Sequence, residues 1–112
     1  MFAGHHRLKN LTVIVDFNRI QGIAPVGGII RLEPFADKWR SFGWEVREVD
    51  GHDHAALGAG LAAGSVRPLC LLCHTVKGKG VDFMEGEARW HYGGLDAAMY
   101  ERAQASLRRS AR

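Results

Sequence analysis

Residues 11–22 read Leu11-Thr12-Val13-Ile14-Val15-Asp16-Phe17-Asn18-Arg19-Ile20-Gln21-Gly22. The short, β-branched and almost continuous apolar run over residues 11–15 predicts a parallel strand buried on both faces. Open α/β sheets bind ligands at the carboxyl ends of their strands, so the polar loop that follows lies where a site is expected. The Asn18 amide oxygen and the Ile20 carbonyl are hard oxygen donors of the type Mg²⁺ prefers. An ordinary strand-to-helix turn explains the same residues, since Asp and Asn also favour turns, and the loop alone leaves both interpretations open.

The composition excludes several classes of protein. The chain has 112 residues, enough for one domain with an apolar core, of which 46% are hydrophobic and 24% charged. No apolar run approaches the roughly 20 residues of a membrane span, and residues 1–9 contain no signal-peptide core, so we expect a cytoplasmic protein that does not bind membranes. The formal net charge is +3. Four arginines gather near the C-terminus without interleaved aromatic residues, which favours a solvated helix end over a nucleic-acid-binding tail: Arg102, Arg108, Arg109 and Arg112.

The rest of the apolar pattern alternates between helix-like and strand-like segments. We expect helices over residues 34–42, 55–63 and 95–109, and further strands over residues 44–49 and 69–73. The turn over residues 50–53 offers an N-cap for the second of these helices. This order predicts an α/β fold, a parallel sheet with helices on both faces and at least one apolar edge exposed. Residues 22–30, which include Pro25 and Gly27-Gly28, are the one stretch expected to be flexible.

Three other motifs carry reactive side chains. The loop His74-Thr75-Val76-Lys77-Gly78-Lys79-Gly80 offers backbone N–H groups and lysine charge to an anion, although a solvated basic loop is the commoner explanation. Trp90-His91 lies between glycines, where a binding role and a tryptophan that plugs the sheet edge weigh equally. Cys70-Leu71-Leu72-Cys73-His74 matches the C-x-x-C-H haem pattern, but its apolar strand context predicts two small buried hydrophobes. The other histidines, His5, His6, His52 and His54, have no regular metal spacing and receive no role.

Taken in chain order, five segments resemble the transketolase family, specifically its diphosphate-binding domain. They are residues 9–21, residues 32–44 (from Leu32-Glu33-Pro34-Phe35 to Phe42-Gly43-Trp44), Val49-Asp50-Gly51-His52-Asp53, residues 74–85, and Trp90-His91. The likeness covers almost the whole chain apart from residues 24–30. Pyruvate-dehydrogenase-type domains are less similar. The resemblance implies that residues 1–112 form part of a transketolase-like thiamine-diphosphate-binding domain with a truncated parallel sheet.

The resemblance also implies a cofactor and roles for three residues. Thiamine diphosphate is bound through Mg²⁺ in this family, and the metal ligands map to the Asn18 side chain and the Ile20 carbonyl. The Ile20 side chain also lies against the cofactor. His91 maps to the histidine that approaches the diphosphate and the sugar substrate, and is the expected catalytic residue. The implied reaction is the transfer of a two-carbon ketol unit between sugar phosphates.

The chain departs from the family pattern in ways that imply a partner. The family carries an upstream Gly-Asp-Gly segment with another metal ligand, and a glutamate in a separate pyrimidine-binding domain. Neither is present here, and residues 1–8 resemble the last turns of a helix. We therefore expect a split subunit or fragment that is inactive alone and needs complementary chains. A non-catalytic remnant or interaction module is the alternative. Arg19 and Tyr92 replace family residues, and the first could crowd the loop while the second could re-aim His91.

Overall fold

The apolar core is built around β3 (Leu69–His74), the central strand of a three-stranded sheet in the computed structural model. Both outer strands, β1 (Thr12–Phe17) and β2 (Glu45–Asp50), pair with β3 in parallel. The strands start in register, because Leu69 lies beside Thr12 on one side and Glu45 on the other. The first five residues of β3 are buried, as an apolar strand covered on both faces should be. The structure describes residues 1–110.

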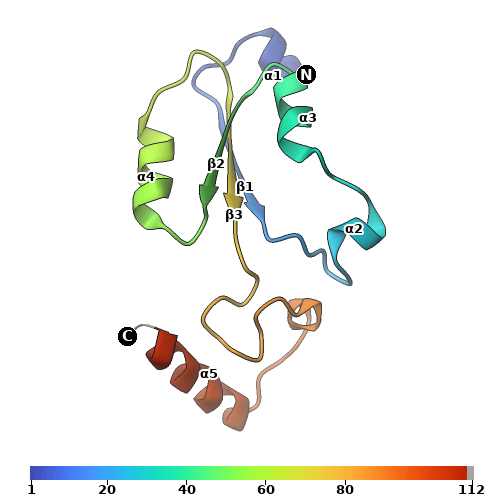
Figure 1. Cartoon of the computed structure of the whole chain (residues 1–112), viewed down its shortest axis with the longest axis vertical. Helices are drawn as coiled ribbons and strands as arrows, with labels where there is room; N and C mark the ends of the chain where they lie inside the picture. The colour runs from blue at the N-terminus through green and yellow to red at the C-terminus, as the bar shows by residue number, and fades with distance from the viewer. Residues whose placement is uncertain (111–112) are drawn as a thin grey trace. The chain divides into compact units, whose positions relative to one another are not determined.

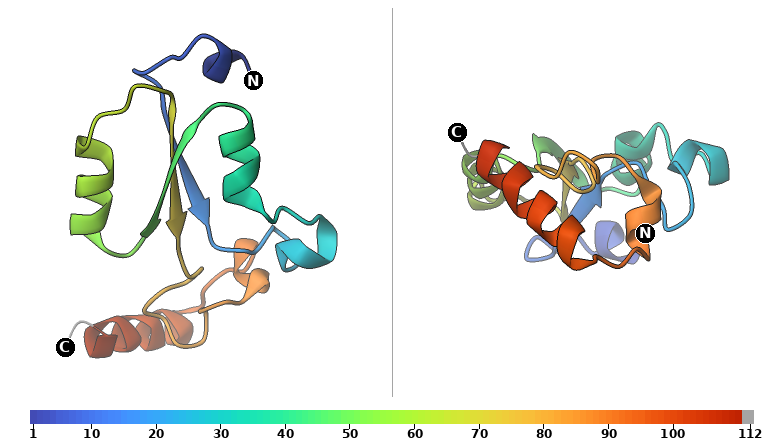
Figure 2. Two further views of the ribbon diagram at one scale, coloured as in Figure 1. Left: turned by 45° about the horizontal axis from the view of Figure 1, so that its top comes forward. Right: turned by 90° about the horizontal axis from the view of Figure 1, so that it is seen from below.

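Helices cover both faces of this sheet, which confirms the predicted α/β architecture. With the strand order β1-β3-β2, the chain moves two places across the sheet and then one place back, so right-handed crossovers put successive helices on opposite faces. The helices α3 (Phe35–Ser41) and α4 (His54–Ala62) do lie on opposite sides of the strands (Figure 1 and Figure 2). On the α3 side, the rings of Phe17 and Phe35 meet with centroids 5.4 Å apart.

The prediction that the first strand is buried on both faces was wrong, because β1 lies at an edge of the sheet. Its first five residues alternate between exposed and half-buried, and Ile14 is 59% exposed, while only the last residue, Phe17, is buried. A continuous β-branched run suits a central strand and a partly covered edge strand equally well, so the pattern does not distinguish them. The expectation of an exposed apolar edge is confirmed at this strand.

The predicted elements are present with shifted ends, and two short helices add to them. The C-terminal helix α5 (Ala97–Ser110) starts two residues later than expected. A single helical turn, α2 (Val26–Ile29), lies in the stretch expected to be flexible. The other is the 3₁₀ helix η1 (Ala88–His91). These two elements of four residues are too short to show a hydrophobic period, which explains why the sequence pattern does not define them. The short helix α1 (Phe2–His5) lies within residues 1–8, where the sequence predicts the last turns of a helix.

Two compact units divide the chain. The first comprises residues 1–17 and 32–75 and contains the sheet with α1, α3 and α4. The second comprises residues 18–31 together with the chain from residue 76 onward, and contains α2, η1 and α5. Within residues 1–110, no helix has the length and apolar character needed to cross a membrane.

Polar contacts hold α5 to the loop that precedes it in the second unit. The Asp82 backbone N–H donates to Ser106 Oγ at 3.0 Å, and the Asp82 carboxylate pairs with Arg109 at 3.0 Å. The guanidinium of Arg102 lies over the Phe83 ring, 4.8 Å from its centroid. Arg102 and Arg109 are both exposed, as the sequence predicts for a solvated helix end, and they make these contacts at the surface. Arg112 lies outside the described residues.

Asp53 caps the N-terminus of α4, as the sequence predicts for this turn. Its Oδ1 accepts the backbone N–H groups of Ala55 at 2.8 Å and Ala56 at 3.0 Å. Replacing Asp53 by alanine removes both bonds, so we expect the free energy of unfolding to fall by about 1 kcal/mol in urea denaturation followed by circular dichroism. Asp53→Asn keeps an acceptor oxygen, so its free energy of unfolding should fall by only a few tenths of a kcal/mol. An equal loss in both variants would contradict the capping role.

Candidate functional site

The second unit contains a cavity of about 370 Å³ at the loop that follows β1. Its volume lies in the range of small-molecule binding sites. The three residues that the sequence proposes as a site, Asn18, Ile20 and His91, all line it. The full lining adds Gln21, Gly22 and Lys77. The fold therefore brings together residues that are more than 70 positions apart in the chain.

Asn18 starts the loop with an Asx turn. Its side-chain Oδ1 accepts the backbone N–H of Ile20 at 2.9 Å, and the intervening Arg19 adopts a φ of +62°. Asn residues favour this local bond, which fixes the direction of the amide group. Because an amide oxygen carries two lone pairs, one is left for a ligand in the cavity.

The Ile20 carbonyl is excluded from the pairing around it. The Val26 N–H donates to the Arg19 carbonyl and the Gln21 N–H donates to the Ala24 carbonyl, each at 2.9 Å. These two bonds form a short antiparallel bridge between Ile20 and Pro25. They use the carbonyl of the residue before Ile20 and the N–H of the residue after it, and leave the Ile20 carbonyl out. No hydrogen bond from residues 1–110 ends on that oxygen. The loop thus presents two neighbouring oxygen donors, one from an amide side chain and one from the backbone.

Lys77, from the glycine- and lysine-rich loop, also lines the cavity. It is half-buried, and its backbone carbonyl accepts the Gly86 N–H at 2.9 Å, which closes the loop over residues 77–86. The sequence motif predicts only a weak anion site in the glycine- and lysine-rich loop and does not single out this residue. The signal is present in the motif, but Lys77 and Lys79 carry the same charge, and only the structure shows which one lines the cavity.

His91 reaches the cavity because Trp90 anchors η1. The Trp90 indole Nε1 donates to the Phe83 carbonyl at 2.9 Å, and the two rings meet edge to face with centroids 5.4 Å apart. Within the second unit, the tryptophan therefore packs against the preceding loop. His91 is exposed at the end of this short helix, so a ligand can reach its imidazole.

The two cysteines are buried hydrophobes, as predicted. Cys70 and Cys73 are free thiols in β3, with 0% and 4% of their surface exposed. Burial raises the pKa of Cys70 to about 11, and burial together with the nearby Asp16 carboxylate raises the pKa of Cys73. Both sulfurs therefore stay protonated at neutral pH and are poor ligands or nucleophiles. Residues 1–110 hold no cluster of three or more His, Cys, Asp or Glu side chains suited to a metal ion.

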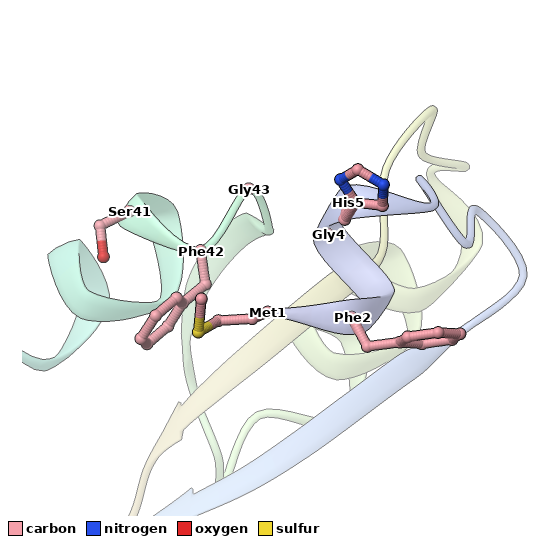
Figure 3. Close-up of a pocket in the computed structure, with 7 residues that line it drawn as sticks. All are labelled: Met1, Phe2, Gly4, His5, Ser41, Phe42 and Gly43. Atoms are coloured by element: carbon pink, nitrogen blue, oxygen red, sulfur yellow. The ribbon is translucent and has the colours of Figure 1, made fainter.

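A second cavity, of about 550 Å³, lies in the first unit between α1 and the end of α3 (Figure 3). Its walls include the side chains of Met1, Phe2 and Phe42, all strongly exposed. Figure 3 shows Met1 extending toward the Phe42 ring while Phe2 points away from it. This cavity contains none of the predicted site residues and offers no set of oxygen donors. The cavity at Asn18, Ile20 and His91 is therefore the better candidate site.

A parallel α/β sheet followed by a loop of oxygen donors is typical of domains that bind phosphorylated ligands at strand ends. Residues 1–109 match the family model described as "Transketolase, thiamine diphosphate binding domain". The chain belongs to this family. The resemblance identified from the sequence is thereby confirmed.

Known relatives agree with this membership. An apulose-4-phosphate transketolase subunit of Phocaeicola vulgatus is 38% identical over 106 residues, which cover 92% of this chain and 38% of that protein. The 6-deoxy-6-sulfo-D-fructose transketolase subunit SqwG of a Clostridium species is 40% identical over 112 residues, 96% of this chain and 40% of that protein. The crystal structure of transketolase from Campylobacter jejuni matches 95% of this chain and 17% of its own, with a TM-score of 0.83 and 27% identity. The chain thus spans about two fifths of the length of the two related subunits.

Proposed function

We propose that this chain is part of a cytoplasmic transketolase-type transferase, and that its cavity holds the diphosphate of thiamine diphosphate through Mg²⁺. The observation that supports this most strongly is the convergence of Asn18, Ile20, Lys77 and His91 on one cavity. Residues 1–112 then act as part of the diphosphate-binding domain. The substrates are sugar phosphates, between which a two-carbon ketol unit is transferred.

The residues present fit such a group. Mg²⁺ requires octahedral oxygen coordination, and the free lone pair of Asn18 Oδ1 and the unpaired Ile20 carbonyl are suitable ligands. The Lys77 ammonium adds a positive charge for a diphosphate. Two protein oxygens leave several coordination positions for phosphate oxygens, water and donors from elsewhere.

Each residue has a distinct task in this proposal. Thiamine diphosphate supplies, when bound, the electron-sink chemistry that a ketol transfer requires. Asn18, Ile20 and Lys77 orient the diphosphate end, and the apolar Ile20 side chain helps to exclude water. The exposed His91 imidazole can donate or accept a proton at Nδ1 or Nε2 toward the diphosphate or a sugar hydroxyl, and is the proposed catalytic residue.

The incomplete ligand set also supports a partner. Two similar proteins are named as subunits of transketolases, and the chain spans about two fifths of their length. We propose that a complementary chain, or chains, supplies a Gly-Asp-Gly metal ligand and the pyrimidine-binding domain. The chain alone should then show no ketol transfer.

Calorimetry with Mg²⁺ and thiamine diphosphate tests the proposal, with and without a candidate partner chain. Asn18→Ala should weaken Mg²⁺-dependent binding by at least about tenfold, since losing even a supporting group of a metal site costs that much. Asn18→Asp keeps an oxygen ligand and the acceptor of the Asx turn, so it should retain binding. Asn10→Ala is the matched control, because Asn10 is exposed and belongs to the first unit.

Three outcomes would contradict the proposal. If Asn18→Ala left the affinity for Mg²⁺ and thiamine diphosphate unchanged, the Asn18 side chain would not be a metal ligand. No heat in any mixture would favour the alternative, a non-catalytic remnant or interaction module. Ketol transfer by the chain alone would contradict the need for a partner.

A further inference from the structure

The ring of Tyr92 packs directly on the proposed catalytic histidine. The centroids of the His91 and Tyr92 rings are 4.6 Å apart and their planes are nearly perpendicular, at 89°. This is the edge-to-face arrangement that aromatic pairs favour. Tyr92 is 78% exposed, so burial in a core does not explain where its ring lies. Its ring does contact the imidazole.

Gly22 closes the other side of this ring pair. A Cβ atom placed on Gly22 would lie 3.2 Å from His91 Cδ2, 3.4 Å from His91 Nε2 and 3.2 Å from the Tyr92 hydroxyl oxygen. The two rings therefore border the space that a side chain at this position of the Asn18 loop would occupy. Gly22 also lines the cavity, which places the Nε2 edge of the imidazole beside it.

No side-chain hydrogen bond of His91 is found within residues 1–110, and the ring contact with Tyr92 and the approach to Gly22 are the contacts that can orient it. We propose that Tyr92 is a positioning residue that holds the His91 imidazole against Gly22, with its Nε2 edge toward the cavity. This inference rests on the proposed function only for the identity of the ligand. The positioning itself is a property of the free protein.

The role of the ring can be measured with two Tyr92 variants and one control. Tyr92→Ala removes the ring, and Tyr92→Phe keeps the ring but loses the hydroxyl. Tyr100→Ala is the matched control, because Tyr100 is a 51% exposed tyrosine on α5 that does not line the cavity. All three substitutions alter exposed side chains, so each variant should fold.

The first readout is the NMR spectrum of the His91 ring protons in the chain without ligand. A ring packed edge to face shifts these resonances, so Tyr92→Ala should abolish the shift while Tyr92→Phe and Tyr100→Ala preserve it. The second readout is calorimetric affinity for Mg²⁺ with inorganic pyrophosphate. Tyr92→Ala should weaken it about three- to tenfold, the range that an edge-to-face ring contact supports, and Tyr92→Phe should not.

The readouts separate the two proposals. Unchanged His91 resonances in Tyr92→Ala would overturn the positioning role, as would equal losses in Tyr92→Phe and Tyr92→Ala. If the resonances change as expected but the wild-type chain binds no Mg²⁺–pyrophosphate either alone or with a candidate partner chain, the positioning role stands and the proposed function fails.

Discussion

Replacing Gly78 by alanine should destabilise the loop that carries Lys77 by about 3 kcal/mol and abolish binding in the cavity. Gly78 has a φ of +73°, which costs an L-residue roughly 1–2 kcal/mol. An alanine Cβ there would also lie 2.7 Å from both Cβ and the carbonyl oxygen of Met84. Because one of these atoms belongs to the backbone, the loop itself must move, and overpacking of this kind costs typically 1–3 kcal/mol.

The loss of binding follows from the position of Gly78 in the closed loop. The Gly86 N–H donates to the Lys77 carbonyl at 2.9 Å, and the Val81 N–H donates to the Gly78 carbonyl at 3.1 Å. A shift at Gly78 disturbs both bonds and moves Lys77 out of the cavity wall. Hydrogen exchange of the amides over residues 76–86 measures the local stability, and calorimetry with Mg²⁺ and pyrophosphate measures the binding.

Gly86→Ala is the matched control for this prediction. Gly86 has nearly the same φ, +72°, but no atom lies within 4 Å of an added Cβ. It should lose only the conformational term, about 1 kcal/mol. Equal losses in the two variants would show that the contact with Met84 is not what makes Gly78 essential.

The elements with a strong local signal could be predicted from the sequence. The apolar run at residues 69–73 predicts a buried parallel strand, and the Asn18–Ile20 pair follows a strand end, where α/β sheets bind ligands. The edge position of β1 could not be deduced, because strand order depends on pairings between distant segments. The family resemblance related His91 to this loop, which local pattern alone could not do.

The finer geometry of the site depends on the conformation of its loops. Loops have no periodic pattern of apolar residues from which their conformation could be predicted. Lys77 lines the cavity and Lys79 does not, although one glycine separates them. The turn at Gly78 decides between the two lysines, and a positive φ leaves no trace in the sequence except the glycine itself. The packing of Tyr92 on His91 likewise results from the way η1 ends.

Replacing Leu71 by alanine should destabilise the first unit by about 3 kcal/mol, within the 2–5 kcal/mol typical of large-to-small core substitutions. Leu71 is 0% exposed at the centre of β3, flanked by Ile14 of β1 and Arg47 of β2. Its methyl groups also meet Gly60 of α4, where an added Cβ would lie 2.9 Å from Leu71 Cδ1. The truncation would therefore leave a cavity between β3 and α4. The strand cannot move to fill this cavity, because it is paired with β1 and with β2.

Leu61→Ala provides the comparison, because it makes the same chemical change on α4 at a side chain that is 46% exposed. Leu61→Ala should lower the free energy of unfolding by less than about 1 kcal/mol. The leucine side chain buries little apolar surface in the folded protein, and alanine is a strong helix former. Urea denaturation followed by circular dichroism and by hydrogen exchange of the β3 amides measures both variants. Similar losses at the two leucines would mean that Leu71 is not at the centre of the core, contrary to its complete burial in the central strand of the sheet.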